Sequence, residues 1–220
     1  EPKIIGENTT SNIPINECIC QIKSKTGKYG IGFFARIPFP TNDKFFNVLI
    51  TSNQLLNSND FSPGKQIQLE LKQSRKNIIL NIDNNRKFYS CNEYNNISII
   101  EIRKEDNITN VSFLDTGNYI NQDGIYLIYY NNNQNEQYYF GNIINISDNI
   151  FRFNHSDINI NMHQTIGCPI LNQDNKVIGM NITINNIYNN NDGILLKNAI
   201  ENFYDEYSNN YIKVIFYDQD

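Results

Sequence analysis

The sequence has few of the features that would point to a membrane or a nucleic acid. No apolar run approaches the roughly 18 residues that a bilayer-spanning helix needs, and the opening EPKIIGENTT has no apolar signal core. Residue 1 is Glu, so a segment upstream of this sequence stays an open alternative. The net charge is only -5, and no run of Lys or Arg is dense enough to follow a phosphate backbone. We therefore expect neither nucleic acid nor a membrane as a partner.

Cysteine and histidine are also scarce. The four cysteines do not suggest a disulfide framework, because Cys18 and Cys20 lie too close on one strand to pair, which leaves Cys91 and Cys168. We expect reduced thiols and a cytoplasmic or other reducing compartment. The two histidines, His155 and His163, flank a polar stretch and lack a third ligand at a characteristic spacing. The sequence predicts no metal and no cofactor.

Short apolar blocks are what the sequence does contain. Ile, Leu, Val, Phe and Tyr recur throughout its 220 residues, separated by Asn-rich connections, so a folded core is expected. The segment from Gln66 to Leu71 alternates strictly between polar and apolar residues, which is typical of a half-buried antiparallel strand. By the same reasoning, strands are predicted at 17 to 23, 30 to 37, 46 to 51, 66 to 73, 77 to 82, 86 to 90, 97 to 102, 124 to 130, 137 to 146, 149 to 154, 167 to 171, 176 to 184 and 192 to 196.

One helix and several loops complete the expected elements. Apolar residues recur at helical spacing from Lys197 to Ser208, with acidic residues on the other side. The Asn-rich stretches 131 to 135 and 189 to 191 are expected to be exposed loop tips, and 211 to 217 is either a final strand or a tail. So many short strands favour a barrel or a sandwich.

Four motifs occur in an order and spacing that match a known family. They are GIGFF (30 to 34), VLITSNQLL (48 to 56), NISIIEI (96 to 102) and TIGCPI (165 to 170), the last followed by KVIGM (176 to 180). Together they resemble the trypsin-like serine proteases of the intracellular, disulfide-free kind, from about residue 15 to residue 204. In that family, a Gly-x-Gly-Phe strand precedes a Leu-Thr-x-x-His turn with the base. A strand beginning with Asp provides the acid, and Gly-x-Ser-Gly-x-Pro provides the nucleophile.

The resemblance implies an all-β fold of two antiparallel six-stranded β-barrels with a C-terminal helix. The expected parts are an N-terminal extension (1 to 13), a first barrel (14 to 110), a second barrel (111 to 196), a helix (197 to 208) and a tail or extra strand (209 to 220). The link between the barrels is expected near Lys104 to Asn107, where the apolar blocks thin out. A β-sandwich unrelated to proteases is the alternative, and strand order distinguishes the two.

The resemblance also implies that the catalytic triad is lost. Gln54 occupies the position of the base, and its amide has no basic nitrogen near neutral pH. Asn96 occupies the position of the acid, and Ile166 that of the nucleophile, where it offers no lone pair and no proton to transfer. Gln164 replaces a glycine of the oxyanion hole. We expect Gln54, Asn96 and Ile166 to lie together at the mouth of the cleft between the barrels.

Recognition, and not a reaction, is then the expected function. The favoured hypothesis is an inactive pseudoprotease that serves as a protein-binding or structural module for a protein or peptide partner, through the old cleft or an exposed strand edge. The alternative is a hydrolase, a peptidase of the same fold, with a displaced nucleophile such as Cys168 and with His163 as a candidate base. Against it, Cys168 stands two residues after the matched position, and no histidine at the base position lowers its pKa.

Overall fold

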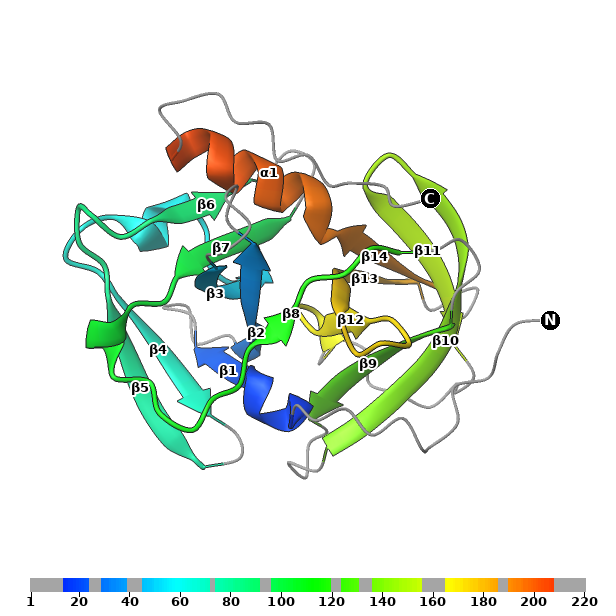
Figure 1. The fold of residues 1–220 in the computed structure, drawn as a ribbon, viewed down its shortest axis with the longest axis horizontal. Coiled ribbons are helices and arrows are strands. Elements are labelled where there is room, and N and C mark those ends of the chain that lie inside the picture. The colour runs from blue at the N-terminus through cyan, green and yellow to red at the C-terminus, as the bar shows by residue number, and fades with distance from the viewer. Residues whose placement is uncertain are drawn as a thin grey trace.

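Two β-sheets lie side by side, and the C-terminal helix crosses above them (Figure 1). The computed structural model describes residues 14 to 23, 29 to 38, 45 to 71, 74 to 91, 96 to 119, 124 to 130, 136 to 155, 165 to 185 and 190 to 207. Within these ranges the protein is all-β apart from short 3-10 turns and the C-terminal helix, so the predicted fold class is confirmed.

The first sheet is a curled half-barrel. It contains β1 (Ile19–Lys23), β2 (Tyr29–Pro38), β3 (Phe45–Ser52), β4 (Gln66–Leu71), β5 (Lys76–Asn81), β6 (Phe88–Ser90) and β7 (Ile97–Glu101) in the order β5-β4-β1-β2-β3-β7-β6, all antiparallel. A short strand, β8 (Leu114–Asp115), pairs in parallel with β2. Along β4 the alternate residues Ile67, Leu69 and Leu71 are buried, as their spacing predicted.

A buried ion pair at the open side of this sheet links the end of β5 to the end of β7 and to the 3-10 turn at 104 to 106; the edge strands β5 and β6 do not pair with each other in the described residues. The Arg86 guanidinium donates to the carbonyl oxygens of Asn81 (3.0 Å) and Glu101 (2.8 Å), and to both carboxylate oxygens of Asp106 (2.9 and 2.6 Å). Its side chain and that of Asp106 are only 2% and 4% exposed. Hydrogen bonds of the Arg86 side chain therefore hold β5, β7 and the 104 to 106 turn together.

The second sheet is a closed six-stranded barrel. Its strands are β9 (Gly124–Tyr130), β10 (Glu136–Ser147), β11 (Ile150–His155), β12 (Pro169–Leu171), β13 (Val177–Asn185) and β14 (Asn190–Leu195), paired around the ring in the order β10-β11-β14-β13-β12-β9. Every pair is antiparallel. Closure excludes the β-sandwich alternative.

The segment around β8 connects the two halves. Leu114 pairs with Ala35 of β2, and the next residue, Asp115, accepts two hydrogen bonds from Arg36 (2.9 and 3.0 Å). Thr116 then forms a bridge to Val177 of β13 in the second barrel. A strand of two residues has no alternation to detect, and the sequence pattern did not predict it.

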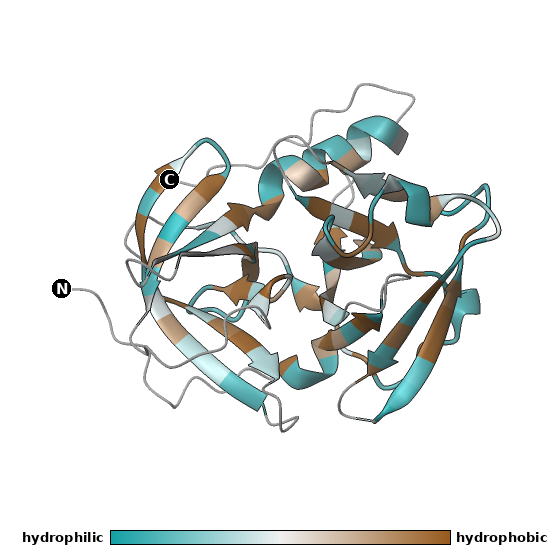
Figure 2. Ribbon diagram, turned by 180° about the vertical axis from the view of Figure 1, so that it is seen from behind, coloured by the Kyte–Doolittle hydropathy of each residue, from teal (hydrophilic) through white to brown (hydrophobic). Residues whose placement is uncertain are grey.

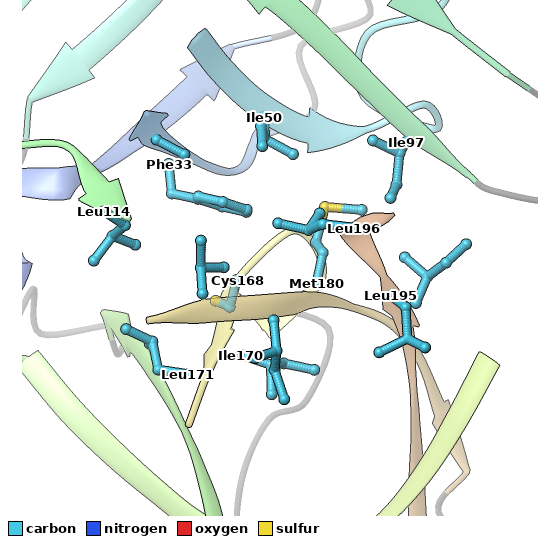
Figure 3. Close-up of a cluster of buried hydrophobic side chains, with 14 of the residues drawn as sticks. Phe33, Ile50, Ile97, Leu114, Cys168, Ile170, Leu171, Met180, Leu195 and Leu196 are labelled. Atoms are coloured by element: carbon cyan, nitrogen blue, oxygen red, sulfur yellow. The ribbon is translucent and has the colours of Figure 1, made fainter. Parts of the chain in front are cut away.

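One apolar core continues from the first sheet into the second barrel. Phe33 and Ile50 of the first sheet belong to the same buried cluster as Cys168, Ile170 and Met180 of the second barrel (Figure 3). A smaller cluster fills the first sheet itself. Figure 2 shows the corresponding alternation of hydrophilic and hydrophobic residues along many of the strands. The boundary between the halves is therefore a packed interface.

The helix α1 (Leu196–Tyr207) packs on both halves, through β6 and β7 of the first sheet and β13 of the second barrel. No helix in the described ranges, α1 included, is long and apolar enough to cross a membrane. The predicted loop tip at 189 to 191 is wrong for two of its residues, because Asn190 and Asn191 belong to β14 and Asn191 is buried. The stretches 1 to 13, 131 to 135 and 209 to 220 lie outside the described residues.

Candidate functional site

The turn after β3 carries Gln54, the residue at the matched base position. The amide nitrogens of Leu55 and Leu56 donate to the carbonyl of Ser52 (3.0 and 3.1 Å), and the Gln54 amide donates to the Ser52 hydroxyl (3.2 Å). Ser52 and Asn53 are buried, while Gln54 is exposed. Three hydrogen bonds to Ser52 hold the turn, which presents an uncharged carboxamide to solvent.

Asn96, at the matched acid position, lies directly beside this turn. Its carbonyl oxygen accepts a hydrogen bond from the amide of Asn53 (2.8 Å), and Ile97 pairs with Ser52. The φ of Asn96 is 40°, in the left-handed region that asparagine tolerates better than most residues. The backbone at the matched acid position thus contacts Asn53, the residue before the matched base position.

A network of neutral polar side chains links the turn after β3 to β6 and β7. The Asn53 amide donates to the Ser90 hydroxyl (2.5 Å), which lies 3.0 Å from the hydroxyl of Ser98. Ser98 in turn donates to the carbonyl of Leu56 (2.6 Å). Sequence reasoning did not identify Ser90 or Ser98. The available signal was a serine inside the apolar run at 97 to 100, since a buried hydroxyl needs a partner.

The turn from Thr165 to Cys168 carries Ile166, the residue at the matched nucleophile position. The Cys168 amide donates to the carbonyl of Thr165 (3.0 Å), and backbone hydrogen bonds join Gly167 and Cys168 to Asn181 of β13 (2.9 and 3.0 Å). Ile166 itself is half-buried. The turn is therefore attached to the second barrel, with an aliphatic side chain at its tip.

The end of β3 and the turn at 165 to 168 meet at the carbonyl oxygen of Ile31 in β2. Thr51, three residues before Gln54, donates its hydroxyl to this oxygen (2.8 Å). Gly167, next to Ile166, lies against the same oxygen, because a Cβ at residue 167 would be 2.3 Å from it. We call this region, from residues 51 to 54 across Ile31 to residues 165 to 168, the interbarrel junction. The roles of Gln54, Asn96 and Ile166 within it stay predictions.

Cys168 is buried in the apolar core behind the junction. Its side chain is 0% exposed and lies near Phe33, Leu114 and Leu171 (Figure 3). Burial raises the pKa of the thiol far above its usual range, so the reactive thiolate is disfavoured. None of the four cysteines, Cys18, Cys20, Cys91 and Cys168, forms a disulfide in the described structure.

The other candidate residues are only partly visible. His163 and Gln164 lie outside the described residues, and for His155 only the backbone is described, at the end of β11 opposite Gly141. In the ranges that the structure covers, no three His, Cys, Asp or Glu side chains are grouped to hold a metal ion. A polar hollow of about 740 Å³ lies between the 116 to 119 segment, the β10–β11 turn and the start of α1, and none of the matched triad positions line it.

Known proteins resemble this chain in fold and not in sequence. No family model and no curated protein matches the sequence. Among solved structures, the serine protease of a human pathogenic astrovirus matches with a TM-score of 0.56 and 12% identity over 82% of this chain and 90% of that chain. The inactive form of Rv3671c from M. tuberculosis matches with a TM-score of 0.60 and 9% identity, over 96% and 98% of the two chains. Deg5 matches with a TM-score of 0.56 and 15% identity, over 84% and 86%. These similarities show that the chain has the fold of the chymotrypsin-like serine proteases.

Proposed function

We propose that this chain is a catalytically inactive relative of the chymotrypsin-like proteases that binds a protein or peptide segment at the interbarrel junction. The observation that carries the proposal is the identity of the residues at the three matched positions: Gln54, Asn96 and Ile166. Each is uncharged, and none can donate and recover a proton during acyl transfer.

The chemistry of the three residues supports loss of catalysis. Attack on an acyl carbon needs an oxygen or sulfur nucleophile whose proton passes to a base. Ile166 has neither lone pair nor proton, and the Gln54 carboxamide is not basic near neutral pH. Asn96 carries no negative charge to stabilise a cation beside it. No single substitution restores such a system.

The alternative nucleophile, Cys168, has the wrong environment. A cysteine reacts as its thiolate, and reactive cysteines lie in partly exposed, electropositive surroundings. The Cys168 thiol is fully buried among apolar side chains, which raises its pKa. To react it would have to lose its proton inside the core and also reach the substrate.

Unlike catalysis, peptide binding needs only hydrogen-bonding and apolar side chains, and the interbarrel junction has both. Gln54 is exposed and can both donate and accept hydrogen bonds, as recognition of a peptide backbone requires. Ile166 offers an aliphatic contact on the opposite turn. A peptide between the two turns would meet a polar side from the first sheet and an apolar side from the second barrel.

Two measurements test the proposal. The purified protein should hydrolyse neither peptides nor esters above background, and a fluorophosphonate probe should not label it. In affinity capture from the native source, wild-type protein should retain a partner that Ile166→Asp loses. The control Ile79→Asp, at an exposed position on β5, should keep it.

Two results would overturn the proposal. Hydrolysis that is abolished both by iodoacetamide and by Cys168→Ala would establish the displaced nucleophile in place of a binding module. Identical captured proteins for wild type and Ile166→Asp would show that the interbarrel junction does not bind the partner.

A further inference from the structure

Three side chains gather on one face of β10, a long strand of the second barrel (Figure 1). Glu136, Tyr138 and Phe140 alternate along the strand and therefore point to the same side. The intervening Tyr139 is buried in the core, so this side faces outward. Tyr138 and Phe140 are 51% and 41% exposed. One short segment thus presents two large aromatic rings to solvent.

A third ring, that of Tyr126 in β9, lies beside these two. Its centroid is 6.0 Å from that of Phe140, with which it pairs across the strands, and 6.5 Å from that of Tyr138. The ring planes differ by only 33° and 35°. Tyr126 is buried and its hydroxyl donates to Oδ1 of Asn175, which holds this ring in place. We call Glu136, Tyr126, Tyr138 and Phe140 the β10 platform.

The carboxylate of Glu136 lies at the edge of the β10 platform. It accepts a hydrogen bond from the hydroxyl of Tyr138. Among the described residues, no Lys or Arg forms an ion pair with Glu136. Aromatic rings also carry partial negative charge on their faces. The carboxylate and the ring faces therefore both attract a cation.

Elsewhere the protein places its own cations over exposed rings. The ammonium of Lys23 lies 5.7 Å from the ring centroid of Tyr29, and the guanidinium of Arg36 lies 5.6 Å from that of Phe45. These two aromatic residues are 57% and 56% exposed, much as Tyr138 is. In the part of the chain that the structure describes, no such cation lies over the β10 platform. The platform is therefore available to a cation from another molecule.

The chemistry of the β10 platform favours a guanidinium over other groups. A guanidinium is planar and weakly hydrated, stacks on aromatic faces, and forms paired hydrogen bonds to a carboxylate. Nearly parallel rings present a surface for a flat group, and do not surround a compact ammonium. An apolar side chain would bury the Glu136 carboxylate without a partner. A nucleobase would bring phosphates towards this carboxylate in a chain whose net charge is -5.

We propose that the β10 platform binds an arginine side chain of a partner protein or peptide, with the guanidinium stacked on Tyr138 and Phe140 and its N–H groups directed to Glu136. None of the residues of the interbarrel junction belongs to this platform. The inference therefore adds a second binding surface and does not depend on the proposed function.

A pair of short peptides tests the need for a positive charge. Acetyl-Gly-Arg-Gly-amide carries the guanidinium, and the same peptide with citrulline carries a neutral urea of nearly the same shape. At equal concentration, the arginine peptide should shift the backbone amide NMR signals of Glu136, Tyr138 and Phe140 more than the citrulline peptide does. Added salt should reduce this difference. Equal shifts with both peptides, or no shift at these three residues, would overturn the inference.

Two variants separate the contribution of the ring from that of the carboxylate. Phe140→Leu keeps an apolar side chain without the ring, and Glu136→Gln removes only the charge. Each should lower the affinity for the arginine peptide about twofold to fivefold. The matched controls, Phe45→Leu at a ring that carries Arg36 and Glu105→Gln at a carboxylate that is 68% exposed, should bind as wild type does. Circular dichroism should show that all four fold. Wild-type affinity in Phe140→Leu or in Glu136→Gln would contradict the proposed contacts.

Selection from a random peptide library identifies the side chain that the β10 platform prefers. Peptides selected on Ile166→Asp, which removes the proposed apolar contact at the interbarrel junction, should still enrich arginine. The double variant with Phe140→Leu and Glu136→Gln should lose this enrichment. Equal enrichment of lysine, enrichment of apolar residues instead, or arginine enrichment that survives in the double variant would refute the inference.

A dilution series tests whether a second copy of the chain occupies the same face. Without any peptide, the NMR signals of Tyr138 and Phe140 should not change with protein concentration. Concentration-dependent shifts of these signals would show self-association through β10, and would overturn the assignment of the platform to an arginine of a different partner.

Discussion

Gly167 of the second barrel lies directly against the backbone of Ile31 in the first sheet. A Cβ at residue 167 would be 2.3 Å from the Ile31 carbonyl oxygen, closer than such atoms can approach, and the φ of Gly167 is +87°. This glycine belongs to the motif that carries the nucleophile in the protease family. In this chain its packing against Ile31 is sufficient to require glycine, whether or not any chemistry remains at Ile166.

Gly167→Ala should therefore be strongly destabilising. The positive φ alone costs roughly 1 to 2 kcal/mol for a residue with a Cβ, and the contact with Ile31 should bring the loss to about 3 kcal/mol or more. The matched control is Gly64→Ala, because Gly64 has a φ of +82° and a Cβ added there would have no neighbouring atom within 4 Å. Urea unfolding measures both losses. Equal losses would show that the contact with Ile31 is unimportant.

Arg86→Ala should destabilise the first sheet by about 3 to 5 kcal/mol, because it leaves the buried carboxylate of Asp106 without its partner. The control is Arg36→Ala, which removes a two-pronged pair with Asp115 whose side chains are 42% and 38% exposed. That pair should contribute about 1 kcal/mol or less. Chemical denaturation, with hydrogen exchange of the β5 and β6 amides, measures the effect. Similar losses in the two variants would show that the buried pair of Arg86 and Asp106 stabilises the fold no more than an exposed pair does.

The thiols should differ sharply in reactivity. Cys18, Cys20 and Cys168 are buried, whereas Cys91 is half-buried. Ellman's reagent should therefore react with Cys91 first in the native protein and with all four cysteines after denaturation without a reductant. Fewer than four reactive thiols under denaturing conditions would reveal a disulfide and contradict the expected reducing compartment.

Stability should fall at alkaline pH in part because of Cys18. Burial raises the pKa of its thiol from 9.0 to about 12, so the folded state holds a proton that the unfolded state releases. The stabilisation is complete below pH 9 and is lost as the pH rises from 9 towards 12. Each such thiol lowers the free energy of unfolding by up to about 1.4 kcal/mol per pH unit in this range. Cys18→Ala should flatten the fall between pH 9 and the onset of tyrosine ionisation near pH 10. An unchanged slope would refute this assignment.

Ile166→Ser alone should not create an active enzyme. Neither Gln54, which cannot accept a proton, nor Asn96, which cannot orient a base, could activate the new hydroxyl. Because Ile166 is half-buried, the variant should fold, with a stability loss of about 1 kcal/mol. Fluorophosphonate labelling and ester hydrolysis should both stay at background. Labelling of this single variant would mean that an unrecognised base lies at the junction.

Much of the architecture follows from local sequence pattern. Alternation in segments such as Gln66 to Leu71 predicts strands because neighbouring side chains on a strand point to opposite faces, whatever the rest of the chain does. The helix at α1 follows in the same way from its spacing of apolar residues. The chemical identities of Gln54, Asn96 and Ile166 are likewise independent of the fold, since no environment gives an isoleucine a transferable proton.

Features that depend on residues far apart in the sequence were decided by the tertiary structure. From the local sequence, Arg86 is expected to be a surface charge and Asp106 to be part of a linker. Both are buried because the first sheet curls around them. Asn191 reads as a loop residue, because asparagine favours turns, yet pairing of β14 with β11 and β13 places it inside the barrel. Residue type and spacing determine which strands form. Whether a polar residue is buried depends on which strands lie beside it, and closure of the barrel decides which strands are neighbours.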